Sequence, residues 1–230
     1  MDNISISVFI PCYNEEQNIG SLLEKTIRFL PEISSDYEII VVDDGSSDST
    51  YEIAQNIAKE NPNVKVIRHV KNKGYGAALR TGFLNSKKDH IFFTDGDNQF
   101  DITELSKLIP YTNNYDIVAG FRINRRDNFI RKINEFCFNR LVRFLFDLKI
   151  RDLNCAFKIY KKEVIDNLTI RSSLAFINSE MLIRAKKKGY GIKEVGVTHY
   201  PREWGRQTGA NLKVILGTFS ELFKFRKELK

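Results

Sequence analysis

The stretch YEIIVVDDGSSDSTYEIAQNIAKE, residues 37–60, contains the complete pattern of a strand, a loop and a helix. It begins with a short run of β-branched apolar residues, which is typical of a buried strand. A polar loop with a glycine follows, and apolar residues then recur at helical spacing. We therefore predict a strand that is followed directly by a helix.

The same order recurs on both sides of this stretch. Apolar runs predict strands at 6–11, 63–69 and 90–95, and helical spacing predicts helices at 15–30 and 74–87. Strands that alternate with helices in this way predict an α/β fold with a mostly parallel, Rossmann-like sheet and helices on both faces.

The second half of the chain is less regular. We predict strands at 115–122 and 192–202, a basic amphipathic helix or pair of helices at 128–148, and helices at 177–190 and 210–230. Residues 151–168 are predicted to form a loop, a strand and the start of a helix. No linker divides the chain, so we expect one catalytic domain at 1–209 and an amphipathic helix at 210–230.

Composition limits the function. A chain of 230 residues with 42% hydrophobic content can bury one core, and no stretch resembles a signal peptide or a spanning helix. Cys12, Cys137 and Cys155 show no CxxC spacing, which favours a reduced, cytoplasmic setting. The net charge is +7, and nine basic residues stand against three acidic ones between 122 and 151. This excess predicts an anionic partner there: a phosphate, a membrane surface or a nucleic acid.

A polar loop follows each of the first four predicted strands: PCYNEE at 11–16, DDGSSD at 43–48, KNKGYG at 71–76 and DGDNQ at 95–99. Ligands of open α/β sheets bind at the carboxyl ends of the strands, so one ligand could touch all four loops. The chain has neither GxGxxG after the first strand nor GxxxxGK[ST], which argues against an NAD fingerprint and a P-loop.

The loop at 95–99 offers two carboxylates and an amide. In an extended segment Asp95, Asp97 and Gln99 would point the same way, with Gly96 letting a ligand approach the backbone. Oxygen ligands favour Mg²⁺ or Mn²⁺, which would neutralise a diphosphate. The alternative is a simple turn that caps the next helix through Asp101.

The loop at 43–48 also has two interpretations. Asp43 and Asp44 stand directly at the end of a strand, where they could accept hydrogen bonds from a ribose or a base. Its later residues could instead only cap the next helix, which is the role we expect for Asp48.

These four loops, in their order and spacing, resemble those of the inverting family 2 glycosyltransferases, which bind nucleotide sugars with a GT-A fold. Later segments look most like the dolichol-phosphate mannosyltransferase and polyprenyl-phosphate glycosyltransferase branch: AGFR, RDLNCAFKIYKK, NSEMLIRAKKKGYGIKEV and PREWGRQT. The resemblance covers residues 4–208, and its motifs are specific in combination.

The resemblance implies a role for individual residues. The nucleotide sugar would be bound by Pro11, Tyr13, Glu15, Asp43, Asp44, Lys73, Asp95 and Gly96. Asp95, Asp97 and Gln99 would hold Mg²⁺ or Mn²⁺ and the diphosphate. Arg122 and Arg131 would bind the acceptor phosphate, and Arg202 would close over donor or acceptor. Two departures from the family pattern concern the acceptor side: Asn134 and Glu135 stand where a serine is frequent, and the late loop reads REWGRQT instead of RxxGxSK.

The expected reaction is attack of a polyprenyl phosphate oxygen on the anomeric carbon of a UDP- or GDP-linked sugar. A phosphate monoester has a second pKa of about 6, so this acceptor needs no strong base. If the acceptor were a sugar hydroxyl, Glu180 is the base we would nominate, although a carboxylate that orients a neighbouring loop is its commoner role. A non-catalytic nucleotide-sugar-binding protein is a further alternative, and without RNP, helix-turn-helix or zinc motifs we expect no nucleic-acid partner.

A lipid acceptor requires contact with a membrane surface. Apolar stripes with basic neighbours at 129–148 and 211–230 are typical of interfacial helices, which predicts a cytoplasmic protein attached at the inner face of the membrane. The alternative is that these stripes pack on the core or form a homodimer.

Overall fold

The structure, a computed structural model, describes residues 4–123, 129–205 and 212–229, with the side chains of 129–134 and 212–215 left out. The described residues form a seven-stranded sheet in the order β3-β2-β1-β4-β6-β5-β7. The strands are β1 (Ser5–Cys12), β2 (Asp36–Asp43), β3 (Val64–Arg68), β4 (His90–Thr94), β5 (Ile117–Ile123), β6 (Phe157–Lys161) and β7 (Ile192–Thr198).

Most neighbouring strands are parallel. β1 pairs in parallel with β2 and β4, β2 with β3, and β5 with β7, whereas β6 runs antiparallel to both β4 and β5. The predicted α/β fold with a mostly parallel sheet is therefore confirmed.

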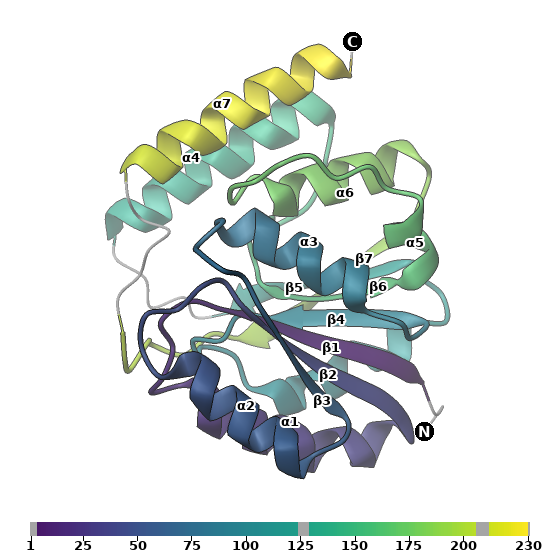
Figure 1. The fold of residues 1–230 in the computed structure, drawn as a ribbon. Coiled ribbons are helices and arrows are strands. Elements are labelled where there is room, and N and C mark those ends of the chain that lie inside the picture. Colours follow the sequence, from purple (N-terminus) through teal and green to yellow (C-terminus); the bar gives the residue numbers. More distant parts are fainter. Residues whose placement is uncertain (1–3, 124–128, 206–211, 230) are drawn as a thin grey trace.

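Helices cover both faces of the sheet (Figure 1). They are α1 (Ile19–Ile33), α2 (Thr50–Glu60), α3 (Tyr75–Asn85), α4 (Phe129–Phe146), α5 (Lys162–Asp166), α6 (Ile177–Lys187) and α7 (Leu212–Glu228), with the 3₁₀ helices η1 (Ile102–Lys107) and η2 (Ile109–Tyr111). α1 and α2 lie on one face, and α3 and α6 lie on the other. Because both faces are covered, the central strands are buried on both sides and read as nearly continuous apolar runs.

The contact between α3 and β1 is unusually close. The rings of Phe9 and Phe83 meet edge to face at 4.8 Å, and Phe9 stacks on Phe93 at 5.4 Å. A Cβ atom on Gly82 would lie 2.2 Å from the Phe9 ring, so α3 can reach this position only with a glycine there. This packing fixes the start of α3 beside the carboxyl ends of the strands.

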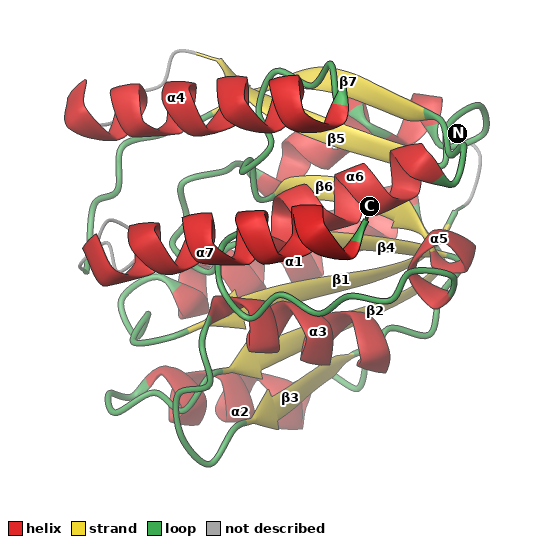
Figure 2. Cartoon of the chain, turned by 90° about the horizontal axis from the view of Figure 1, so that it is seen from above, coloured by secondary structure: helices red, strands yellow, loops and turns green. Residues whose placement is uncertain are grey.

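α4 and α7 form an outer layer beyond α6, and both views show them side by side (Figure 2). Phe138 of α4 meets Phe219 of α7 at 5.5 Å, and Phe146 meets Phe225 at 5.6 Å. One face of the terminal helix is therefore packed within the chain. Over the described part of the chain, no helix combines the length and the apolar character that crossing a bilayer requires.

Candidate active site

The loops that follow β1, β2, β3 and β4 meet at one edge of the sheet, as predicted. The backbone N–H of Asn14 donates to Ser46 Oγ at 2.9 Å, and the N–H of Ser47 donates to Asn14 Oδ1 at 2.9 Å. The N–H of Gly96 donates to the carbonyl of Pro11 at 3.2 Å. These hydrogen bonds join the loops into one surface.

Asp43 and Asp44, predicted to contact the nucleotide, are both buried and bonded to protein groups. Asp43 accepts from the N–H of Ser46 at 3.1 Å and lies 3.2 Å from Arg68 Nε. Asp44 contacts His69 Nδ1 at 2.6 Å and accepts from the N–H groups of Lys73 and Gly74, at 2.9 and 2.8 Å. In this structure the two carboxylates hold the loops after β2 and β3 in place, and Lys73 contributes its backbone N–H to this arrangement.

Three carboxylates gather where β1 and β4 end: Glu15, Asp95 and Asp97. Burial and, next, the charge of Asp97 together raise the pKa of Asp95 to about 7. Burial likewise raises the pKa of Glu15, against the hydrogen bonds from Arg202 and Asn18 that lower it. Carboxylates whose pKa values are raised by burial and by one another are stabilised when a cation joins them.

Arg202 is such a cation. Its Nη2 lies 2.6 and 2.7 Å from the two carboxylate oxygens of Glu15, and its Nη1 lies 3.2 Å from Asp97 Oδ2. The side chain is only 11% exposed. The late loop thus reaches the acidic residues at the strand ends, which brings three of the predicted site residues into direct contact.

Gln99 lies differently from our prediction. The chain turns at 95–98, with Asn98 in the left-handed region at φ 59°, so the argument from an extended segment is wrong. The side-chain amide of Gln99 donates to the carbonyl of Tyr200 at 3.0 Å, and the backbone N–H of Gln99 donates to Asp97 Oδ1 at 3.2 Å. Its role as a metal ligand stays a prediction, and its observed contact holds the late loop.

The residues fit a divalent metal that also binds the donor. Within the described ranges no group of three or more His, Cys, Asp or Glu side chains is arranged to hold a metal by itself. The contact of Arg202 with Glu15 and Asp97 shows, however, that the acidic residues bind a positive charge. Mg²⁺ is usually held by one or two carboxylates together with phosphate oxygens of the substrate, and Asp95 and Asp97 supply such a pair.

Arg122, predicted to bind the acceptor phosphate, is buried in an ion-pair set. Its Nε and Nη2 lie 2.7 Å from the carboxylate oxygens of Asp152, and Nη2 also contacts Glu135 of α4. Burial alone would raise the pKa of Asp152, but the hydrogen bonds and charge of Arg122 bring it well below its ordinary value. Arg131 belongs to α4, and its side chain lies outside the described residues.

Glu180 is fully buried at the first turn of α6. Its carboxylate accepts from the backbone N–H groups of Arg171 and Ser172, at 3.1 and 2.8 Å, and from Arg184 Nε at 2.8 Å. These contacts match the alternative interpretation, in which this carboxylate orients the preceding loop.

Tyr75 and Lys158 were missed by the sequence analysis. The Tyr75 hydroxyl donates to Asp95 Oδ1 at 3.0 Å from the first position of α3. Lys158 is fully buried in β6, where its ammonium group donates to the carbonyls of Leu153 and Cys155. Burial lowers the pKa of Lys158. The sequence did carry a signal for Lys158, because this lysine interrupts an apolar run whose residues are consecutively buried in β6, whereas nothing local distinguishes Tyr75.

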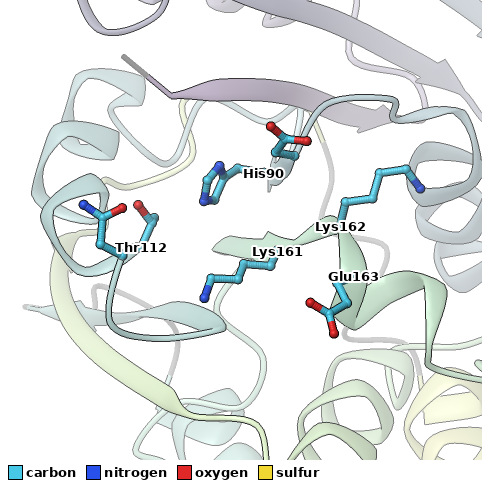
Figure 3. Close-up of a pocket in the computed structure, with 7 residues that line it drawn as sticks. His90, Thr112, Lys161, Lys162 and Glu163 are labelled. Carbon is cyan, nitrogen blue, oxygen red and sulfur yellow. The ribbon is translucent and has the colours of Figure 1, made fainter. Parts of the chain in front are cut away.

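A surface cavity of about 370 Å³ lies at the opposite end of β4 (Figure 3). It is lined by Asp89, His90, Thr112, Asn113, Lys161, Lys162 and Glu163. Its lysines are paired with acids, Lys161 with Asp116 at 3.1 Å and Lys162 with Asp166 at 2.6 Å. This cavity therefore stands apart from the acidic residues at the carboxyl ends of the strands.

The mostly parallel sheet with acidic loops at the carboxyl ends of its strands agrees with the class that comparison with known proteins shows, the glycosyltransferases. The chain belongs to glycosyl transferase family 2, whose family model matches residues 7–169. It is a glycosyltransferase, and the family expected from the sequence motifs is confirmed.

Several curated relatives are similar over most of this chain. A dodecaprenyl-phosphate galacturonate synthase of Rhizobium johnstonii is 29% identical over 98% of this chain and 69% of its own length. An undecaprenyl-phosphate 4-deoxy-4-formamido-L-arabinose transferase of Pectobacterium carotovorum is 31% identical over 92% of this chain and 64% of its own length. The Dictyostelium discoideum dolichyl-phosphate beta-glucosyltransferase is 30% identical, over 86% and 67%. The chain thus spans about two thirds of these relatives.

Solved structures share the fold at low sequence identity. A glucosyl-3-phosphoglycerate synthase of Mycobacterium tuberculosis, in complex with Mn²⁺, UDP and glucosyl-3-phosphoglycerate, superposes with a TM-score of 0.78 at 18% identity, over 96% of this chain and 79% of that one. The mannosyl-3-phosphoglycerate synthase of Rubrobacter xylanophilus gives 0.78 at 14% identity, over 98% and 74%. These similarities confirm the GT-A fold.

Proposed function

We propose that the protein transfers a sugar from a nucleoside-diphosphate sugar to a polyprenyl phosphate, with inversion at the anomeric carbon and with Mg²⁺ or Mn²⁺. The observation that carries the proposal is that Glu15 and Asp97, close to the buried Asp95, engage the cation Arg202 at the carboxyl ends of the strands. The acceptor is supported by the relatives, whose names specify dodecaprenyl, undecaprenyl and dolichyl phosphates.

On the donor side, Pro11 lies near the end of β1, and Tyr13 and Glu15 lie on the loop after it, where the nucleoside would bind. Gly96 packs against the end of β1 so closely that a Cβ atom there would lie 2.6 Å from Cys12 Sγ. Asp95 and Asp97 would hold the metal ion, which when bound neutralises charge on the diphosphate. The Tyr75 hydroxyl fixes Asp95, because it donates to one carboxylate oxygen.

On the acceptor side, an oxygen of the phosphate forms a bond to the anomeric carbon. The bond from that carbon to the diphosphate breaks, and the nucleoside diphosphate leaves with the electron pair. The phosphate acceptor is largely ionised at neutral pH, so position and positive charge are the main requirements. Arg202 and Arg131 are our candidates to supply that charge, whereas Arg122 is engaged by Asp152 and Glu135 and would act by fixing α4.

A hydroxyl acceptor is less well supported by the contacts. The base for that reaction would be Glu180, whose carboxylate oxygens already accept from two backbone N–H groups and from Arg184. A base must be within reach of the proton that it removes, and these contacts orient Glu180 toward its own loop.

The test is sugar transfer to a short polyprenyl phosphate from a panel of UDP- and GDP-sugars with Mg²⁺ or Mn²⁺. We expect transfer from one donor, reduced on the order of 10²- to 10³-fold in Asp97→Ala. The matched control is Asp36→Ala, an exposed residue at the opposite end of the sheet. Hydrolysis of one donor without transfer to the lipid would keep the donor site and overturn the acceptor.

We also propose that the outer layer contacts the inner face of the membrane. Its exposed apolar side chains are Phe136 and Phe144 of α4 and Leu216 and Phe223 of α7, and Phe144 is 84% exposed. Exposed basic residues accompany them: Arg140, Lys224, Arg226 and Lys227. Large apolar side chains beside basic ones suit an anionic lipid surface.

The membrane contact is tested by sedimentation with vesicles of phosphatidylglycerol or phosphatidylcholine. We expect binding to the anionic vesicles and weaker binding by Phe144→Glu. Leu84→Glu is the matched control, because Leu84 is 83% exposed but lies at the far end of α3. Equal vesicle binding by both variants and the wild type would contradict membrane contact through this face. A concentration-dependent dimer that Phe144→Glu disrupts would indicate that the face forms a homodimer instead.

A further inference from the structure

The segment 200–205 is held over the acidic residues by a backbone anchor and a side-chain clamp. The anchor is at its start, where the N–H of Tyr200 donates to the carbonyl of Gln99 at 2.9 Å and Gln99 Nε2 donates back to the Tyr200 carbonyl at 3.0 Å. The clamp is Arg202, which contacts Glu15 and Asp97. The anchor can persist when the clamp opens, since the two use different groups.

The guanidinium of Arg202 lies where the proposed reaction requires the positive charge of the metal ion. It contacts Asp97, one of the two aspartates proposed to hold the metal ion, at Oδ2. It also spans to Glu15, on the loop that would bind the nucleoside. A dication on Asp97 and a guanidinium 3.2 Å from the same carboxylate would repel each other at close range. The two cations therefore compete for this carboxylate.

We infer that Arg202 is an internal competitor of the metal-bound donor: the donor and its metal ion expel the guanidinium from Glu15 and Asp97, which frees the segment 200–205. This inference rests on the proposed function for the identity of the donor. The released guanidinium becomes available to an anionic acceptor only after the donor is in place. The protein consequently binds the donor first and the acceptor phosphate second.

Trp204 is a built-in reporter of this release. It is the single tryptophan of the chain and is 54% exposed. Arg202 Nε donates to its backbone carbonyl at 2.7 Å. The next residue, Gly205, has φ +80°, and a Cβ atom there would lie 2.7 Å from Arg202 Nη2. The backbone around the tryptophan is thus shaped around the clamped guanidinium, and its emission changes when the clamp opens.

The first experiment uses Mn²⁺ alone, with free Mn²⁺ measured by electron paramagnetic resonance. Because a competing cation is removed, we expect Arg202→Ala to bind Mn²⁺ on the order of tenfold more tightly than the wild type, an ordinary size for a coupling between two ligands. Arg202→Gln should act in the same direction. Arg28→Ala is the matched control, since it removes one positive charge from an exposed ion pair on α1. Unchanged or weaker Mn²⁺ binding by the Arg202 variants would overturn the inference.

The second experiment follows Trp204 emission while Mg²⁺ with UDP or GDP is added, and calorimetry reports binding independently. When the ligands are added, we expect the emission of the wild type to move toward that of ligand-free Arg202→Ala. The emission of Arg202→Ala should change little on the same addition. Binding without any change in wild-type emission contradicts the release. Failure of the proposed function has a different signature, because absence of sugar transfer leaves the Mn²⁺ competition intact.

Discussion

Two arginines of this protein, Arg122 and Arg202, each contact two carboxylates, and they differ in what those carboxylates belong to. Arg122 is 4% exposed and joins Asp152, in the loop before β6, to Glu135 of α4. Arg202 is 11% exposed and joins Glu15 to Asp97, on two loops of the proposed donor site. The first set connects parts of the scaffold, whereas the second bridges two loops that we propose bind the donor.

This difference teaches how similar ion pairs acquire different roles. A buried pair resists the loss of one partner, because the other charge is then left in a low-dielectric interior. A pair beside a ligand site can exchange one cation for another, because an incoming metal ion compensates the same carboxylates. We therefore expect substitutions at the Arg122 set to lower stability and substitutions at the Arg202 set to alter binding.

The largest effect is expected from Asp152→Ala, which removes the bidentate partner of Arg122. The buried guanidinium would keep Glu135 but lose two hydrogen bonds of 2.7 Å, and we expect the free energy of unfolding to fall by about 3–5 kcal/mol. Urea denaturation measures it. Asp36→Ala, which breaks a surface pair with Lys88, should change stability little. Equal losses of unfolding free energy in both variants would contradict the distinction between buried and exposed ion pairs.

The same set predicts a dependence on pH. The pKa of Asp152 is lowered in the folded protein, so its contribution is present in full above the unfolded pKa of about 3.9 and is lost as the pH falls below that value. Wild type and Asp152→Asn should therefore differ by about 2–3 kcal/mol at pH 7 and by less when the pH drops below about 4. Urea denaturation at several pH values tests this, and a constant difference would contradict it.

The sequence was sufficient to predict the N-terminal half of the fold and the place of its acidic residues. Alternating strand and helix patterns indicated the parallel sheet, and the rule for strand ends placed Glu15, Asp95 and Asp97 at one edge. It was not sufficient for the arginine partners. Arg122 meets Asp152 and Glu135, which are 30 and 13 residues away, and Arg202 meets Glu15, which is 187 residues away. Such pairs depend on where helices pack, and no local pattern encodes that.

The error at Gln99 was of a different kind. We took residues 95–99 as extended, although glycine and asparagine in DGDN favour a turn, and the chain turns there. The alternation of side chains then no longer applies, so Gln99 faces Tyr200. The turn interpretation had been open from the sequence, and the strand rule was applied to residues 95–99, beyond the end of β4 at Thr94.

A smaller effect on the donor-side cluster is expected from Tyr75→Phe. The variant keeps the ring but removes the hydroxyl that donates to Asp95 at 3.0 Å, so the carboxylate is less well fixed. We expect the rate of sugar transfer to fall roughly tenfold, equivalent to about 1.4 kcal/mol, with a higher metal concentration needed for half-maximal activity. Tyr190→Phe is the control, since that hydroxyl accepts from Asn167 on the surface. A similar loss in the control would contradict a role through Asp95.

The finest test of the comparison replaces each arginine by lysine. A lysine has one ammonium group in place of a planar fork, so it cannot match two carboxylates at once. At position 122, where Asp152 is held bidentately, we expect Arg122→Lys to lower the free energy of unfolding by about 2 kcal/mol. At position 202, Arg202→Lys should change stability by less than Arg122→Lys does, because the carboxylates of Glu15 and Asp97 lie on loops and not on packed helices or strands. Its Mn²⁺ affinity should instead rise by roughly threefold, less than in Arg202→Ala, since the ammonium still competes for one carboxylate. Urea denaturation and Mn²⁺ titration of both variants give the two readouts, and a stability loss at 202 with unchanged Mn²⁺ binding would mean that both arginines are structural.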